Sequence, residues 1–133
     1  MKHFFLDTNI WLDWLLIREG NEDAWELITA SEENKCKLFT SAITISTVTY
    51  ILRKEPDSRI ILHKLLMVSE IIETKKTAFL QALTSNFKDM EDAYQYFTAI
   101  SLSNIDAIVT NNGKDFKNSI LPILKAKQAI KLL

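Results

Sequence analysis

Two short apolar runs, each ending abruptly in polar residues, stand out in the pattern of hydrophobic and polar positions along the chain. Phe4-Phe5-Leu6 leads directly to Asp7, and residues 107–110 lead into the polar run 111–115. Runs of this length with such a boundary are typical of strands buried on both faces. Open parallel sheets bind their ligands at the carboxyl ends of their strands, so we expect the chemistry to lie where these two strands end.

Apolar residues at helical spacing fill most of the remaining chain. The predicted helices begin after Asn9 and at Asn21 and cover residues 42–53, 57–68, 77–83, 92–103 and 127–133; shorter strands are predicted at 37–41, 71–74 and 120–124. A polar break at residues 18–21 separates the first two helices. The inner faces are assigned to Ala24, Trp25 and Ile28 in the second helix and to Ala93, Tyr96, Phe97 and Ile100 in the sixth.

Strands that alternate with helices indicate βαβ units. The predicted fold class is therefore α/β, with a central, mostly parallel sheet covered on both faces by helices. Only two glycines and two prolines occur, and no linker, repeat or low-complexity segment is visible. We expect residues 1–133 to form a single domain.

Composition narrows the function classes. Apolar residues make up 47% of the chain and charged residues 25%, which is ordinary for a soluble globular protein. The single cysteine, Cys36, has no partner for an internal disulfide, so a reduced, cytoplasmic setting is expected. We expect no signal peptide, no apolar run reaches about 20 residues, and two glycines could hardly form a phosphate-binding loop. A net charge of −1 gives no global signature of nucleic-acid binding, although a local basic rim remains open.

Three carboxylates are candidates for one pocket. Asp7 and Asp115 follow strands that end at the same edge of a parallel sheet, and Asp92 lies on the inner stripe of the sixth predicted helix. Mg²⁺ and Mn²⁺ prefer such oxygen ligands. Structural roles stay open for each acid: Asp7 as a helix cap, Asp92 as the partner of a capping Asp89, and Asp115 as a turn residue.

The three acidic segments resemble the PIN-domain family, and VapC-like toxins in particular. The matching motifs are Leu6-Asp7-Thr8-Asn9-Ile10, Asp89-Met90-Glu91-Asp92-Ala93 and the run from Ile108 to Phe116. The resemblance implies a three-layer α/β/α sandwich and an RNA-cleaving Mg²⁺ or Mn²⁺ site. Carried over position by position, Asp7, Asp92 and Asp115 match the acidic ligands, and Asn9, Thr110 and Asn112 match polar residues that support them.

One position departs from the family pattern. PIN nucleases usually carry a Glu on the helix after the second strand, and Thr47 stands at the matching position here. Either Glu91 or Asp89 is available to compensate, although Glu91 shares its stripe with Gln95 and Thr98, a face predicted to be solvated. The missing Glu leaves open a PIN-like module that binds RNA or protein without cutting. A DNA-directed nuclease is the least favoured alternative.

The resemblance also implies partners. VapC-like toxins pair with a small antitoxin that lies along the early helices, and a homodimer is expected. Trp11, Trp14 and Trp25 are predicted to belong mainly to the core, with a partner groove as the alternative. Lys114 and Lys117 flank Asp115 and are the favoured candidates for phosphate contacts.

Overall fold

The computed structural model describes residues 1–18 and 21–133 and shows five parallel strands in the order β3-β2-β1-β4-β5. The strands are β1 (Lys2–Leu6), β2 (Cys36–Ser41), β3 (Glu70–Ile72), β4 (Ala107–Val109) and β5 (Ile123–Leu124). Phe5 of β1 lies in register with Phe39 of β2 on one side and Ile108 of β4 on the other. The central strand is thus the first element of the chain.

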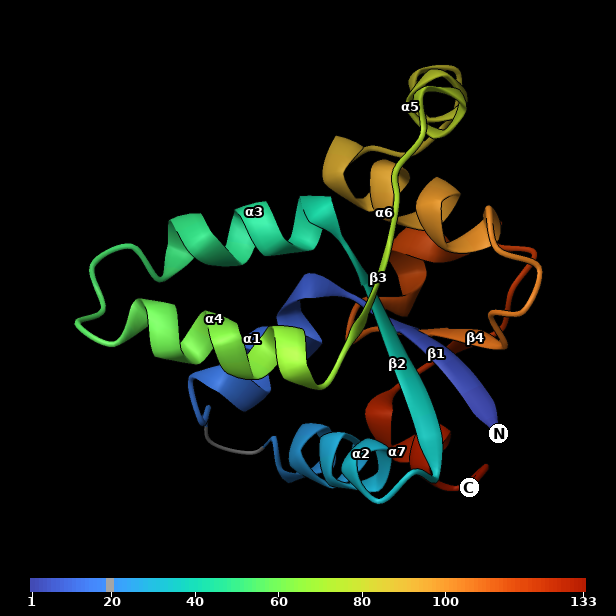
Figure 1. Cartoon of the computed structure of the whole chain (residues 1–133). Coiled ribbons are helices and arrows are strands. Elements are labelled where there is room, and N and C mark those ends of the chain that lie inside the picture. The colour runs from blue at the N-terminus through green and yellow to red at the C-terminus, as the bar shows by residue number, and fades with distance from the viewer. Residues whose placement is uncertain (19–20) are drawn as a thin grey trace.

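Helices cover both faces of the sheet, as predicted for an α/β/α sandwich (Figure 1). They are α1 (Thr8–Leu15), α2 (Glu22–Glu32), α3 (Ala42–Ile51), α4 (Ser58–Met67), α5 (Lys76–Leu83), α6 (Met90–Ile100), α7 (Ala126–Ile130) and the short 3₁₀ helix η1 (Gly113–Phe116). One layer holds α1–α4 and α7, and the other holds α6 and η1 with α5 packed on α6. None of the described helices is long and apolar enough to cross a membrane.

Alternation along β1 divides the core in two. Phe4 and Leu6 point into the larger cluster with α1–α4 and α7, and Phe5 points into the smaller cluster with α6 and η1. All three side chains are almost fully inaccessible to solvent. A strand buried on both faces reads as a continuous apolar run, which is why the sequence identified β1 correctly.

The strand order places a topological switch at the centre of the sheet. From β1 the chain moves outward to β2 and β3, and it then crosses back to β4 on the other side of β1. The carboxyl ends of β1 and β4 are consequently neighbours, and the backbone amide of Asp7 donates to the carbonyl of Val109 at 2.9 Å. This is the place where open α/β sheets bind their ligands.

Several details differ from the sequence prediction. Helix α6 begins at Met90, directly after its cap Asp89, and ends at Ile100 rather than residue 103. Strand β3 begins one residue earlier than predicted and α7 covers only 126–130. Part of the predicted break at 18–21 lies outside the described residues.

The three tryptophans are not equally buried. Trp11 is fully buried, whereas Trp25 is 44% exposed, so the prediction that Trp25 belongs to an inner face is wrong. Trp25 packs edge-on against Trp14 at 6.5 Å between ring centroids, and Trp14 is itself only partly buried. An apolar periodicity cannot separate the centre of a core from its margin, because both use the same residue types.

Candidate functional site

Asp7 occupies the carboxyl end of β1 and begins α1. Its Oδ1 accepts from the backbone amide of Thr8 at 2.8 Å, and its Oδ2 accepts from the hydroxyl of Thr110 at 2.9 Å. The residue is 6% exposed. The structural interpretation of Asp7 as a helix cap is therefore correct, and a second oxygen of the same carboxylate is held by the residue that follows β4.

Asp92 lies in the first turn of α6, which turns it toward the end of β1. Its backbone amide donates to Oδ1 of Asp89 at 3.1 Å, which is the capping arrangement expected from the sequence. Burial raises the pKa of Asp92 to about 7, and the negative charges of Asp7, Asp89, Asp115 and Glu91 add to the rise. The capping bond uses the backbone of Asp92, so its carboxyl group stays available.

Asp115 is carried by η1, the turn that follows β4. Its backbone amide donates to the carbonyl of Asn112 at 3.0 Å, and its side chain is exposed. Asp115 contributes to the raised pKa of both Asp7 and Asp92. The three predicted acids therefore face one region, although they come from the first tenth and the last third of the chain.

Glu91 also belongs to this region, and the predicted orientation of its stripe is wrong. Gln95 and Thr98, which share the stripe, are both buried. Glu91 turns toward α3, where its Oε2 accepts from the hydroxyl of Thr47 at 2.7 Å and its Oε1 from that of Thr8 at 3.4 Å. Asp7, Glu91, Asp92 and Asp115 are called the acid cluster below.

The contact between Glu91 and Thr47 bears on the departure from the family pattern. Thr47 stands where PIN nucleases usually carry a Glu. Its side chain is shorter than that of Glu, which leaves room for a carboxylate from another helix. Glu91 fills that room from α6. A negative charge is thus present beside α3, supplied by a different element.

A buried polar network connects the acid cluster to α3. Gln95 donates through Nε2 to the hydroxyls of Thr8, at 3.1 Å, and of Thr44, and its Oε1 accepts from Ser41 at 2.7 Å. All four side chains are buried. Such a network holds its members in fixed rotamers, because each lost bond would leave a buried polar group without a partner. Sequence reasoning missed these residues, although Ser41, the N-cap of α3, and Thr44 and Thr47 within α3 are spaced three positions apart.

Two predicted supporting residues occupy different places. The side chain of Asn9 is exposed, and in residues 1–18 and 21–133 no hydrogen bond joins it to the acid cluster. The contact of Asn112 is through its backbone amide, which donates to the hydroxyl of Thr110 at 3.0 Å. Thr110 therefore joins the acid after β1 to the turn after β4, and it does so with both functions of its hydroxyl.

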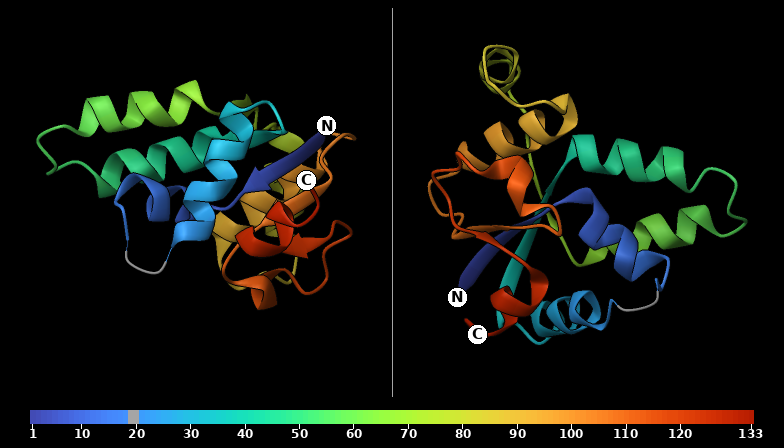
Figure 2. Two further views of the ribbon diagram at one scale, coloured as in Figure 1. Left: turned by 90° about the horizontal axis from the view of Figure 1, so that it is seen from below. Right: turned by 180° about the vertical axis from the view of Figure 1, so that it is seen from behind.

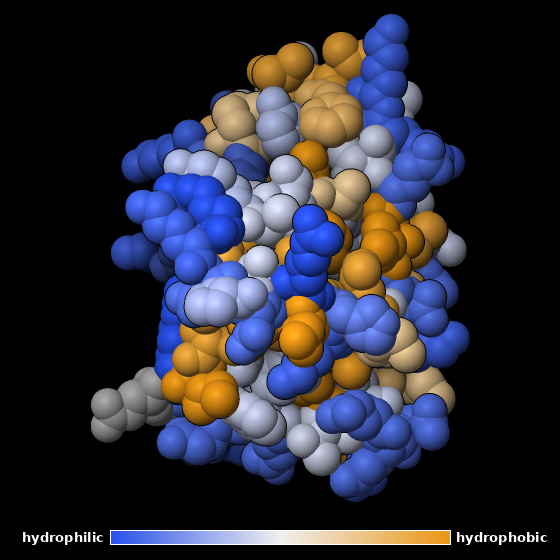
Figure 3. All heavy atoms as spheres, turned by 60° about the vertical axis from the view of Figure 1, so that its left-hand side comes forward, coloured by the Kyte–Doolittle hydropathy of each residue, from blue (hydrophilic) through white to orange (hydrophobic). Residues whose placement is uncertain are grey.

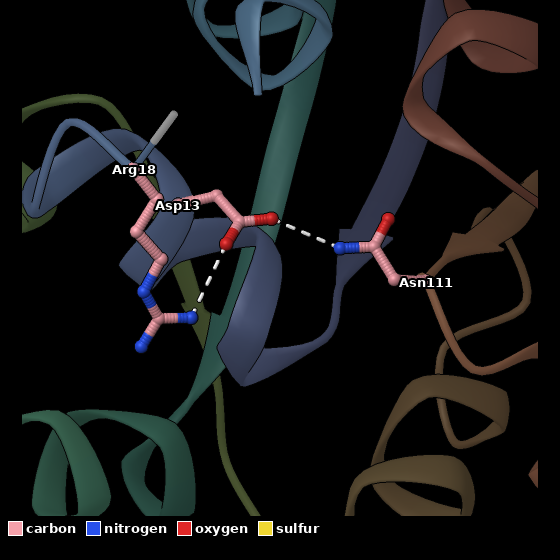
Figure 4. Close-up of polar contacts among 3 residues, drawn as sticks. All are labelled: Asp13, Arg18 and Asn111. Atoms are coloured by element: carbon pink, nitrogen blue, oxygen red, sulfur yellow. Dashed lines mark hydrogen bonds and ion pairs between the residues drawn. The ribbon is translucent and has the colours of Figure 1, made fainter. Parts of the chain in front are cut away.

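A second buried acid on α1 holds the same turn from the other side. Oδ2 of Asp13 accepts from Nδ2 of Asn111 at 2.9 Å, and its Oδ1 forms an ion pair with Nη1 of Arg18 at 3.2 Å (Figure 4). Neither Asp13 nor Asn111 was singled out by sequence reasoning. The bond from Asn111 fixes the chain just before η1, and thereby the position of Asp115.

The electrostatics of the acid cluster favour a cation. Burial raises the pKa of Asp7; the hydrogen bonds from Thr110 and Thr8 lower it, and the charges of Glu91 and Asp115 raise it. Hard oxygen donors that repel one another fit Mg²⁺ or Mn²⁺. In the described parts of the chain no three Asp, Glu, His or Cys side chains are arranged to ligate one ion. Mg²⁺ commonly uses only one or two carboxylates and completes its shell with water and substrate, so a pair from the cluster is a sufficient donor set.

Comparison with known proteins identifies relatives of this arrangement. Residues 3–114 match a family model described as PIN domain. A comparison with curated protein sequences found no significant match.

Three similar solved structures are VapBC proteins. The chain from Rickettsia felis VapBC2, bound to a DNA fragment from the promoter, is 20% identical with a TM-score of 0.67, covering 92% of this chain and 98% of that one. The chain from VapBC-1 of nontypeable Haemophilus influenzae is 17% identical with a TM-score of 0.67, covering 94% and 98%. The chain from DNA-bound VapBC of Salmonella typhimurium is 18% identical with a TM-score of 0.69, covering 95% and 99%. At these identities the likeness shows a shared fold.

Proposed function

The chain belongs to the PIN-domain family, and on that premise we propose that it is a metal-dependent endoribonuclease and the toxin of a type II toxin–antitoxin pair. The observation that carries the proposal is the acid cluster at the switch point of the sheet. Four carboxylates from the N-cap of α1, α6 and η1 face one region there, and burial and mutual repulsion raise the pKa of two of them. A protein maintains such repulsion at a functional site more readily than elsewhere.

In this proposal a pair among Asp7, Asp92 and Asp115 holds Mg²⁺ or Mn²⁺, and water and substrate complete the shell of the ion. When bound, the ion supplies an activated water and offsets the charge that develops on the phosphodiester. Thr110 orients Asp7 through its hydroxyl, and Thr8 donates to the same carboxylate through its backbone. Asn9 and Asn112, which the family motif predicted as supporting residues, have exposed side chains at the edge of the site.

We assign Glu91 the part of the acid that the family usually carries on the helix after the second strand. Its carboxylate is held in place by Thr47, the residue at that position, and by Thr8 next to Asp7. This arrangement favours an active enzyme over the alternative, a PIN-like module that binds RNA or protein without cutting. The alternative was motivated by a missing negative charge, and Glu91 provides one.

Cleavage of single-stranded RNA tests the main proposal. The purified protein is expected to cut RNA when Mg²⁺ or Mn²⁺ is added and to lose this activity in EDTA. Asp7→Asn, which keeps the shape of the side chain, is the matched control for a contaminating nuclease. Equal cleavage by wild type and variant would contradict the assignment of Asp7 to the metal.

A charge swap tests the role of Glu91 against the non-cutting alternative. Glu91→Thr is expected to lower cleavage, and Glu91→Thr combined with Thr47→Glu is expected to restore part of it, because the acid then approaches from α3. If cleavage appears only after Thr47→Glu alone, the natural protein is a non-cutting relative. The single variant Thr47→Ser keeps the hydroxyl and serves as the control.

We expect an antitoxin as a partner in the cytoplasm. Large apolar side chains are exposed on α3 and α4, away from the acid cluster: Tyr50, Ile51, Ile60, Leu66 and Met67. In the view that brings the α3–α4 side forward, apolar side chains appear among charged ones (Figure 3). A neighbouring gene for a small DNA-binding protein, and a stable complex on co-expression, would support this expectation. Light scattering tests the expected homodimer.

A further inference from the structure

A cavity of about 940 Å³ opens beside the acid cluster and extends well beyond the carboxylates. Its walls are the loop 85–89, one side of α6, and the segment 114–120 that includes η1. This segment lies next to α6 in the view from behind (Figure 2). Asp92 and Asp115 stand at the cavity as well, so it is continuous with the proposed metal position. We call it the side pocket.

Aromatic rings form the floor of the side pocket. The ring centroid of Phe87 is 5.3 Å from that of Tyr96 and 6.1 Å from that of Phe97, and Tyr96 and Phe97 are in edge-on contact at 5.1 Å. The hydroxyl of Tyr96 accepts from the backbone amide of Ile120 at 2.9 Å, which ties the floor to the outer wall. Phe87 and Phe97 are only partly buried. The floor is therefore a fixed set of rings with accessible surface.

The rim of the side pocket carries basic side chains close to the acid cluster. Lys88, Lys114 and Lys117 line it, and all three are exposed. In the described part of the chain none of them takes part in an ion pair. Asn86 and Asn118 add amide groups at the mouth. Lysines on the rim, amides at the mouth and rings on the floor match, in order, the phosphate, the polar edge and the face of a nucleotide.

We propose that the side pocket receives one unstacked base of a single-stranded RNA, next to the phosphodiester held at the acid cluster. The base stacks on Phe97 and Phe87, and Lys114 and Lys117 contact the adjoining phosphates. This inference rests on the proposed ribonuclease function for the choice of RNA. Aromatic floors with basic rims are the usual means by which proteins bind unpaired nucleotides, and volumes of this order accept ligands of that size.

Binding can be measured without cleavage. The Asp7→Asn protein in EDTA is titrated into fluorescently labelled single-stranded RNAs of about 10 nucleotides, and anisotropy gives Kd. In this background Phe97→Leu keeps an apolar side chain but removes the ring face, and it is expected to raise Kd roughly 5- to 100-fold. Tyr94→Leu is the matched control, because Tyr94 is a half-buried aromatic residue of α6 outside the side pocket. Thermal unfolding confirms that both variants are folded.

Abasic nucleotides show whether the ring binds a base. One abasic position is moved along the RNA, and at one position it is expected to raise Kd as much as Phe97→Leu does. The two changes together are expected to have no more effect than either alone, because both remove the same contact. Additive effects at every position would overturn the proposal.

The salt dependence of binding tests the rim. Lys117→Ala is expected to lower the slope of log K against log[salt] by about 0.7, the value for one phosphate contact on a single strand. Lys64→Ala on α4 is expected to leave the slope unchanged. Equal slopes for Lys117→Ala and the parent protein would contradict a phosphate contact at the rim.

The two proposals fail separately. If Phe97→Leu and the abasic RNA weaken binding but the wild-type protein cuts no RNA with either metal, the pocket stands and the ribonuclease assignment falls. If the wild type cuts RNA and Phe97→Leu binds as tightly as Tyr94→Leu, the pocket assignment falls. DNA of the same sequence, bound as tightly as RNA, would overturn the restriction to RNA.

Discussion

Asp7 and Asp13 are two buried carboxylates on neighbouring stretches of chain, with exposed fractions of 6% and 5%, and their surroundings are opposite. Asp13 is paired with the guanidinium of Arg18 on one oxygen and the amide of Asn111 on the other. Among residues 1–18 and 21–133 the donors to Asp7 are Thr8 and Thr110, which are both neutral, and the nearby charges that raise its pKa are negative.

The contrast shows that burial alone does not mark a functional acid. A buried carboxylate is costly unless its charge is compensated, and Asp13 is compensated within the chain. Asp7 has no cation among the groups that shift its pKa, so its charge is left for something that binds. The sign of the neighbouring charges thus distinguishes the proposed functional acid from the structural one. Substitution of Asn for Asp at both positions tests this distinction.

The largest expected effect is the difference in cleavage rate between the Asp7→Asn and Asp13→Asn variants. Asp7→Asn is expected to reduce the rate of RNA cleavage more than the roughly 10- to 100-fold caused by losing an outer partner of a metal ligand. Asp13→Asn keeps one oxygen that can accept from Asn111, so it is expected to retain most of the activity at temperatures where it is folded. Initial rates with Mg²⁺ decide, and a similar loss in both variants would remove the distinction.

Thr110→Val should affect Asp7, because Thr110 is the one side-chain donor to Asp7 among the described residues. The variant keeps the shape of Thr110 but loses the bond to Oδ2 of Asp7 and the acceptor for the amide of Asn112. Cleavage is expected to fall about 10- to 100-fold. Thr110→Ser retains the hydroxyl and is expected to stay close to wild type; equal loss in both would point to packing of the methyl group instead.

The two substitutions should rank in the opposite order when stability is measured instead of activity. Asp13→Asn loses the ion pair with Arg18 and cannot accept from both of its partners, so the free energy of unfolding is expected to fall by about 1–3 kcal/mol. Asp7→Asn is expected to cost less, because the hydroxyl of Thr110 can turn and accept from the new amide. Urea denaturation in EDTA measures both, and a larger loss for Asp7→Asn would break the comparison.

The smallest effect concerns the pH dependence of stability. The pKa of Asp92 is about 7 in the folded protein against 3.8 for the ordinary side chain, so the folded state binds more protons between these values. Stability is therefore lost as the pH rises through that window. Asp92→Asn removes this loss, and in EDTA its Tm is expected to exceed that of wild type by about a degree or two near pH 8.

At about pH 4 the two melting temperatures are expected to converge, because the wild-type carboxyl is then largely protonated. Mg²⁺ at pH 8 is expected to raise the Tm of wild type more than that of Asp92→Asn. A difference that is constant between pH 4 and pH 8 would contradict a titrating Asp92.

The sequence predicted the parts of the fold that depend on local pattern. Strands β1 and β4 are continuous apolar runs, Asp89 caps α6, and the three acids match family motifs. It did not predict the inward direction of Glu91 and Gln95. On α6 the apolar residues suggested a single buried face. The polar face also points inward, because Glu91 and Gln95 form hydrogen bonds with the hydroxyl groups of Ser41, Thr47 and Thr8.

That pairing depends on how α3 and α6 approach each other across the sheet, which no periodicity within either helix contains. The same limit applies to Asp13. Its role follows from Asn111, which is 98 positions away in the chain. Polar residues with distant partners were therefore the residues that sequence reasoning misplaced or overlooked.

The central position of β1 has a consequence for protein synthesis. Asp7 is synthesised well before the residues that complete its site: the hydroxyl that orients it is 103 positions further along the chain, and Asp115 lies further still. The parallel pairing of β1 with β4 forms only after most of the chain has been made, because such non-local contacts close last. A nascent chain that ends before β4 contains the first carboxylate without the partners that give it a function. Under the proposed function, the chain acquires activity on RNA only once β4 and η1 have been synthesised and have joined β1.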